Sequence, residues 1–171
     1  MGLSLRYATV DDARLIADIS HQTFYETFAK TNRREDMHKF LNEQFTKGKL
    51  ILEVGTPENT FILAEAAMQI AGYVKLRDSR QPVSLGNCCG LEIARLYALQ
   101  AWIGKGVGKL LMQASIEHAK SKGKDVVWLG VWENNHRAIE FYTRWGFSKF
   151  DETDFLLGDD LQRDWLMKKE I

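Results

Sequence analysis

The sequence predicts a mixed α/β fold of the α+β kind, built on a strongly twisted central sheet of about seven strands with helices on both faces. Residues 91–147 contain two successive strand–loop–helix units, a hairpin of strands at 60–66 and 69–76 precedes them, and two more strands follow. The early strands look antiparallel, whereas the strand–helix–strand unit requires a parallel pair with a right-handed crossover. Together these observations predict a mixed sheet.

Length and composition fit a single domain that spans residues 1–171. Lys plus Arg and Asp plus Glu both number 23, so zero net charge gives no reason to expect a nucleic acid or an anionic membrane as partner. Cys88 and Cys89 are adjacent and form no disulfide framework, which fits a reducing compartment. We find no secretory signal and no apolar run of about 18 residues, so the expected location is the cytoplasm.

The N-terminal elements follow from apolar spacing. Leu3 to Tyr7 alternate as in a strand, and apolar residues from Ala13 to Phe28 recur at three- and four-residue steps, which predicts a helix with a break near Ser20. A second helix is expected over 32–47, and 46–59 is expected to be a surface connection.

The later elements follow the same rules. The hairpin turns at Ala67–Met68, and 77–90 is expected to be a loop before a strand at 91–99. A helix ends at Gly123, a strand covers 126–131, and a helix stops at Gly146. Strands at 147–155 and 162–169 complete the sheet, with Trp165 and Met167 as candidates for the buried face of the last one.

Three glycines, Gly104, Gly106 and Gly108, precede the first helix of the 91–147 stretch. Glycines there let backbone N–H groups approach an anion, so a phosphate or pyrophosphate is the natural ligand. The Walker spacing fails, because only three residues separate Gly104 from Gly108 and a leucine follows Lys109. The dinucleotide fingerprint fails as well, since the spacing is G-x-G-x-G. On spacing alone, an ordinary strand–helix turn is an equal alternative.

The second unit carries Asn135, Ala138 and Tyr142 at steps that place them on one helix face. Asn135 could be only a helix cap and Tyr142 only a core aromatic. The four histidines show no metal-ligand spacing with Cys or carboxylates, so we predict no metal site.

Taken together, the two units resemble the GNAT superfamily of acetyl-coenzyme A dependent N-acetyltransferases, most sharply over residues 92–147. The resemblance implies acetyl-coenzyme A as co-substrate. It implies that backbone amides of the glycine turn bind the pyrophosphate, at Gly104, Lys105, Gly106, Val107, Gly108 and Lys109. The pantetheine arm would pair with the strand edge at Leu96, Tyr97 and Ala98. Asn135 would contact the arm, and Tyr142 would approach the sulfur.

One position departs from the family pattern. Ile103 stands where the family usually has Gln or Arg, so a side-chain contact to the pyrophosphate is missing.

Acetyl transfer to an amine requires a neutral nucleophile, a donor for the carbonyl oxygen and a proton for the departing thiolate. We assign the last role to Tyr142, and a backbone N–H near Ala98 is the simplest oxyanion donor. Glu92 occupies a strand position where some family members hold a glutamate base, although a salt-bridged or surface carboxylate is an equal alternative. Glu133 is a second candidate base. Family members that modify ribosomal-protein N-termini place a glutamate where this chain has Gly130.

Within the family, the chain looks most like bacterial spermidine/spermine N-acetyltransferases. The shared segments are Thr23-Phe24 with Thr27-Phe28, Ile70 to Lys75, Leu91-Glu92-Ile93 and Trp128 to Glu133. A polyamine is therefore the favoured acceptor. Anionic anchors for it are available at Glu26, Glu35, Asp36, Glu133, Asp159 and Asp160, and Trp132 and Tyr25 could add cation–π contacts.

Other readings stay open at this point. The acceptor could be another small amine or a peptide N-terminus, and the chain could be a coenzyme A-binding regulator without turnover or a nucleotide-binding module. Dimers are common in the resembling family, and the last strands could supply an interface for a homodimer.

Overall fold

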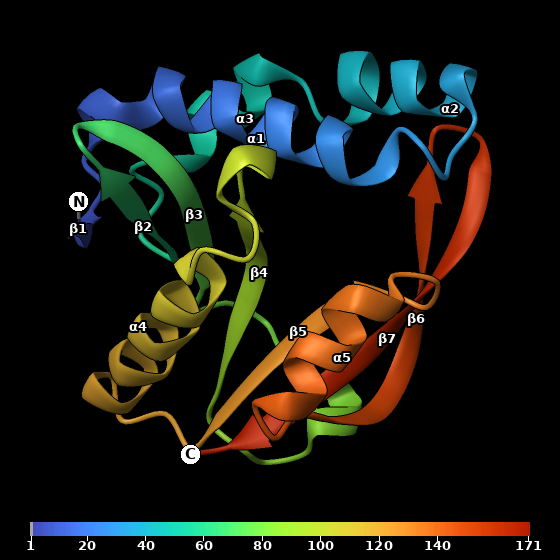
Figure 1. Cartoon of the computed structure of the whole chain (residues 1–171). Helices are drawn as coiled ribbons and strands as arrows, with labels where there is room; N and C mark the ends of the chain where they lie inside the picture. The colour runs from blue at the N-terminus through green and yellow to red at the C-terminus, as the bar shows by residue number, and fades with distance from the viewer. Residues whose placement is uncertain (1) are drawn as a thin grey trace.

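A computed structural model describes residues 2–171 of the chain (Figure 1). Its centre is a seven-stranded sheet with the order β1-β2-β3-β4-β5-β7-β6. The pairs from β1 to β4 are antiparallel, β4 and β5 are parallel, and β5-β7-β6 is antiparallel again. The mixed sheet predicted from the sequence is confirmed.

The N-terminal strands are β1 (Leu3–Tyr7), β2 (Asn59–Ala66) and β3 (Gln69–Arg77). The predicted hairpin joins β2 to β3 through Ala67 and Met68, both at positive φ of 49° and 65°. Two successive residues at positive φ give a turn whose twist matches that of the strands.

The helices before β2 differ in part from the prediction. α1 (Ala13–Phe28) is one unbroken helix, so the break expected near Ser20 is wrong. The helix expected over 32–47 divides into α2 (Arg34–Lys39) and a π-helical segment, Phe40–Gln44. The expected surface connection contains α3 (Lys47–Glu53), whose N-cap Thr46 accepts a hydrogen bond from the amide of Lys49.

The C-terminal half begins with β4 (Gly90–Ala98), α4 (Val107–Ser121) and β5 (Val126–Trp132). It continues with α5 (His136–Arg144), β6 (Ser148–Leu157) and β7 (Asp160–Glu170). These bounds lie within a few residues of those expected from the sequence.

Helices cover both faces of the sheet, as predicted. α4 and α5 pack on one face, where Leu111, Met112 and Tyr142 join the core of Val127, Leu129 and Met167. On the other face Ile16 and Ile19 of α1 pack against Phe61, Leu63 and Tyr73. The end of α1 and the π-helical segment pack against Leu157 of β6. We call the face under α1 the α1 face.

Candidate active site

The two central strands part in the middle of the sheet. β4 and β5 pair only at Gly90–Val126, Leu91–Val127 and Glu92–Trp128. A register shift on the β3 side then falls between Ile93 and Arg95, and such a bulge bends its strand. Figure 1 shows β4 and β5 diverging from this closed end toward α1. Beyond Glu92 the backbone edge of β4 has no pairing partner in β5, and we call this gap between the two strands the slot.

The glycine turn lies at the open end of the slot. Gly104 and Gly106 have φ of +79° and +87°, which residues with a Cβ rarely adopt. Gly106 is the N-cap of α4, and no side chain caps the first amides of this helix. Four donors at a helix N-terminus have no partner inside the helix, and the helix dipole favours an anion there. This turn therefore fits a pyrophosphate, and Lys105 stands beside it with Nζ 5.1 Å from the Trp102 ring.

The predicted pantetheine-binding residues lie on the edge that faces the slot. Leu96, Tyr97 and Ala98 pair with Val74, Tyr73 and Gly72 of β3, so one side of their backbone is satisfied. No residue of β5 pairs with them on the other side. Their outward N–H and C=O groups can pair with an amide-containing chain as another strand would.

Asn135 is the N-cap of α5, which was one of the two interpretations of this residue from the sequence. Its side-chain oxygen accepts a hydrogen bond of 3.3 Å from the amide of Ala138. Tyr142 follows two turns later and is buried against Phe141 and Phe147. Burial raises the pKa of Tyr142 to about 12, so its phenol keeps its proton at neutral pH. It is therefore in the protonation state that a proton donor needs.

Glu92 lies at the closed end, on the α1 face. Both of its carboxylate oxygens accept hydrogen bonds from the Arg77 guanidinium, at 2.6 and 2.9 Å. Such a bidentate pair occupies one lone pair of each oxygen and holds the carboxylate in place. The structure thus contains the salt bridge that was the alternative to a base at this position.

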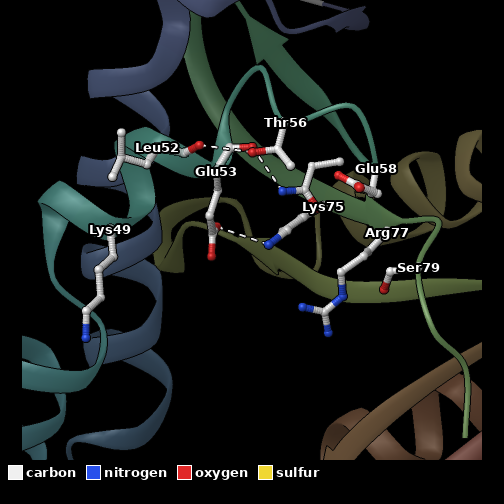
Figure 2. A pocket seen from close by; sticks show the side chains of 9 residues that line it. Lys49, Leu52, Glu53, Thr56, Glu58, Lys75, Arg77 and Ser79 are labelled. Carbon is white, nitrogen blue, oxygen red and sulfur yellow. Dashed lines mark hydrogen bonds and ion pairs between the residues drawn. The ribbon is translucent and has the colours of Figure 1, made fainter.

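A charged pocket of about 380 Å³ lies on the β3 side of this face, under α3 (Figure 2). Lys75 is buried and lies 3.1 Å from Glu53, while Arg95 donates to the other oxygen of Glu53 at 2.8 Å. Desolvation and the charge of Arg95 lower the pKa of Lys75 to about 8. Because Figure 2 shows its ammonium turned toward Glu53, we interpret this cluster as a brace between α3 and the sheet.

The open end carries carboxylates and aromatic rings on the α1 face. Trp132 of β5 meets Phe28 of α1 edge-on at 6.1 Å between ring centres. Asp164 of β7 is the strand-register partner of Trp132, and Glu133 is the next residue after Trp132 in the chain. Glu133 raises the pKa of Asp164, after the larger effect of burial, so the two carboxylates lie near each other.

The other predicted anchors have structural partners. Glu26 accepts a hydrogen bond of 3.0 Å from the amide of Gln100, and buried Asp36 accepts one of 2.9 Å from the amide of Asp159. Tyr25 is exposed on α1. Within residues 2–171 no cluster of three or more His, Cys, Asp or Glu could hold a metal, and no helix is long and apolar enough to cross a bilayer.

A parallel strand pair that splays, with an uncapped glycine-rich helix N-terminus at the open end of the slot, fits the binding of a coenzyme thioester by an acyltransferase. Residues 16–147 match the acetyltransferase (GNAT) family, and the chain belongs to that family. Acetyl-coenzyme A is accordingly its co-substrate.

Three relatives illustrate the match. An uncharacterised N-acetyltransferase of Lactobacillus delbrueckii is 40% identical over 153 residues, 90% of this chain and 88% of the relative. The spermine/spermidine N(1)-acetyltransferase of Bacillus subtilis is 37% identical over 62 residues, 36% of this chain and 41% of that protein. The PaiA N-acetyltransferase of Thermoplasma acidophilum, solved with coenzyme A, shares the fold with a TM-score of 0.80 at 23% identity, covering 100% of both chains.

Proposed function

We propose that this enzyme acetylates a primary amine by direct transfer and that a polyamine such as spermidine or spermine is its favoured acceptor. The observation that supports the proposal most is the proximity of the carboxylates of Asp164 and Glu133 to the Phe28–Trp132 aromatic pair at the open end of the slot. A polyamine carries several ammonium groups, which carboxylates and aromatic faces attract. The partial similarity to the Bacillus subtilis enzyme supports the same acceptor class.

The residue roles form part of this proposal. The glycine turn from Gly104 to Lys109 holds the pyrophosphate, and the edge of Leu96, Tyr97 and Ala98 aligns the pantetheine arm. Asn135 contacts that arm through the amide nitrogen that its cap does not use. Tyr142 donates its hydroxyl proton to the departing sulfur. Because Arg77 donates to both oxygens of Glu92, we infer that Glu92 holds β3 and β4 together at the closed end and does not take a proton from the amine.

An acceptor panel with thiol detection tests this function. It compares spermidine and spermine with amino acids, aminoglycosides and peptide N-termini, at a fixed saturating concentration of acetyl-coenzyme A. We expect the highest kcat/KM for a polyamine, and a fall in that preference at high salt because the attraction is electrostatic. A peptide N-terminus as best substrate would overturn the polyamine assignment, and coenzyme binding without thiol release would indicate a regulator.

Glu133 offers a sharper test of the anchoring role. The Glu133→Gln substitution should raise KM for spermidine by about 3- to 10-fold and leave kcat nearly unchanged, since it removes an attraction present in both ground and transition states. Asp154→Asn is the matched control, because this exposed carboxylate of β6 neighbours Thr153, which pairs with Asp164, and so faces the opposite side. Equal KM values for the two variants would contradict the role of Glu133.

A further inference from the structure

One residue in the middle of β5 is open to solvent. Gly130 is exposed, although Leu129 and Val131 on either side of it are buried and β5 is an inner strand. β7 pairs along its whole length on one side, whereas β4 leaves it after Trp128 on the other. Gly130 therefore forms part of the floor of the slot, on the α1 face.

A carboxylate reaches this floor from the neighbouring strand. A Cβ placed on Gly130 would lie 3.6 Å from Oδ2 of Asp164 on β7. Asp164 itself pairs with Trp132, so its side chain leans diagonally back toward Gly130. The carboxylate near this glycine of β5 therefore comes from β7.

The surroundings of Asp164 leave its charge uncompensated. Its side chain makes no hydrogen bond or ion pair within the described part of the chain, and the titratable groups that face it are Glu133 and Tyr97. β6 places uncharged Thr153 opposite it, and α1 contributes the ring of Phe28 against Trp132. Burial first, and then the charge of Glu133, raise the pKa of Asp164 from 3.8 to about 6.

Tyr97 connects this carboxylate to the predicted proton donor. Burial raises the pKa of the Tyr97 phenol, and the nearby Tyr73, Tyr142 and Asp164 raise it further. Tyr142 and Asp164 are therefore both within electrostatic reach of one ring on β4, from opposite sides of the splayed strands. An acid and a base that act on one substrate approach it from different sides, which this placement allows.

We propose that Asp164 is the general base of the transfer, accepting the proton that the amine nitrogen releases as it attacks the acetyl carbon. This rests on the proposed amine acceptor. The new C–N bond forms and the C–S bond breaks, while Asp164 takes the nitrogen's proton and Tyr142 gives its own to the sulfur. A proton passed through water from Asp164 to Tyr142 then restores both groups. The overall change is amine plus thioester to amide plus thiol, with no other reactant.

The decisive experiment is the pH dependence of kcat/KM for Asp164→Asn, with the best amine of the acceptor panel. The wild-type enzyme should lose activity as the pH falls through about 6. The variant should be about 100- to 1,000-fold slower at pH 7.5 and should lack that acidic limb. Its affinity for acetyl-coenzyme A, measured by calorimetry, should be unchanged. Asp154→Asn should keep both the rate and the limb.

A relocated carboxylate separates a catalytic role from a structural one. The Cβ of a Gly130→Glu variant fits, because the nearest atoms to a Cβ at this position are 3.6 Å or more away. In the Asp164→Asn background it should restore at least about tenfold of the lost rate and bring back an acidic limb, since a base supplies typically 10²–10⁴-fold. A gain without a limb would indicate only a structural effect and would overturn the assignment.

The failures of the two proposals are distinguishable. If the wild-type enzyme releases no thiol with any amine, the proposed function fails. If it turns over an amine but Asp164→Asn keeps the rate and the limb, Asp164 is not the base. If Glu92→Gln loses the acidic limb instead, the glutamate on β4 is the base despite its pairing with Arg77.

Discussion

The two ends of the β4–β5 slot differ in whether the carboxylate there has a cationic partner. At the closed end, where the strands still pair, Glu92 is held by two hydrogen bonds from Arg77. At the open end, Asp164 has no such partner in residues 2–171, and its pKa is raised by burial and by Glu133. A partly buried charge without a partner costs stability, and such groups cluster at functional sites. The difference separates a group that holds the sheet from one that is available to a substrate.

Replacing Tyr142 should slow the enzyme to a degree similar to replacing Asp164, because it removes the proton donor that complements that base. We expect Tyr142→Phe to lower kcat by about 100-fold, the lower end of what general acid catalysis contributes. The ring keeps its packing against Phe141 and Phe147, so the thermal unfolding midpoint should change little. Steady-state kinetics with thiol detection measures the rate, and full turnover by the variant would remove Tyr142 from the acid role.

Glu92→Gln tests the closed end. The variant leaves the Arg77 guanidinium without its counter-charge, and Glu92 is only 11% exposed at its side chain. We expect a loss of about 1 to 2 kcal/mol in the free energy of unfolding, discounted because Arg77 is partly exposed. Urea unfolding at pH 7.5 measures it, and kcat should fall far less than in Asp164→Asn. A large rate loss with unchanged stability would reverse the comparison.

Asp164→Asn should change stability in the opposite direction. The folded pKa of Asp164 is about 6 against an ordinary 3.8, so the folded chain holds this proton more tightly. Protonation of Asp164 therefore contributes to the free energy of unfolding in full below pH 3.8, and this contribution is lost as the pH rises through about 6. Above that pH the neutral amide should stabilise the fold by about 1 to 2 kcal/mol, a value reduced for solvent in the slot.

The measurement is urea unfolding at pH 4 and at pH 7.5. The variant should be more stable than the wild type at the higher pH, with the gap narrowing toward pH 4. Asp154→Asn, which changes an exposed carboxylate, should show no such pH-dependent gap. A destabilised Asp164→Asn at pH 7.5 would mean that the carboxylate has a structural partner at the open end.

The sequence predicts the elements whose stabilising contacts lie between residues close together in the chain. The strand–loop–helix units of 91–147 were predictable because apolar period, glycines and caps all lie within a few residues of one another. α3 was missed because it is short and contains Gly48, although Thr46 carries a cap signal. The division of the 32–47 helix at Phe40 reflects packing of aromatic rings against β6, which no local pattern contains.

Asp164, the proposed base, was not predicted from the sequence for the same reason. The sequence drew attention to Glu92 because some members of the resembling family hold a glutamate base at this strand position, and to Gly130 only as a position without a glutamate. Asp164 lies 34 positions further along the chain, and its approach to Gly130 depends on the register of β5 with β7. Register between strands that are not neighbours in sequence is set by the whole core, so a single sequence does not reveal it.

The smallest expected effect comes from adding charge to the open end. Ile103 is 39% exposed, next to the glycine turn, and stands where the family usually has Gln or Arg. Ile103→Arg should tighten the binding of acetyl-coenzyme A by about 3- to 10-fold at low salt, because a guanidinium adds a charge-assisted hydrogen bond to the pyrophosphate. Calorimetry at two salt concentrations measures it, and the gain should shrink as salt screens the pair. Ile103→Leu, which adds no charge, should bind like the wild type. If the arginine variant binds no better, the amides of the glycine turn already satisfy the pyrophosphate, and the open end needs no cationic side chain at that position.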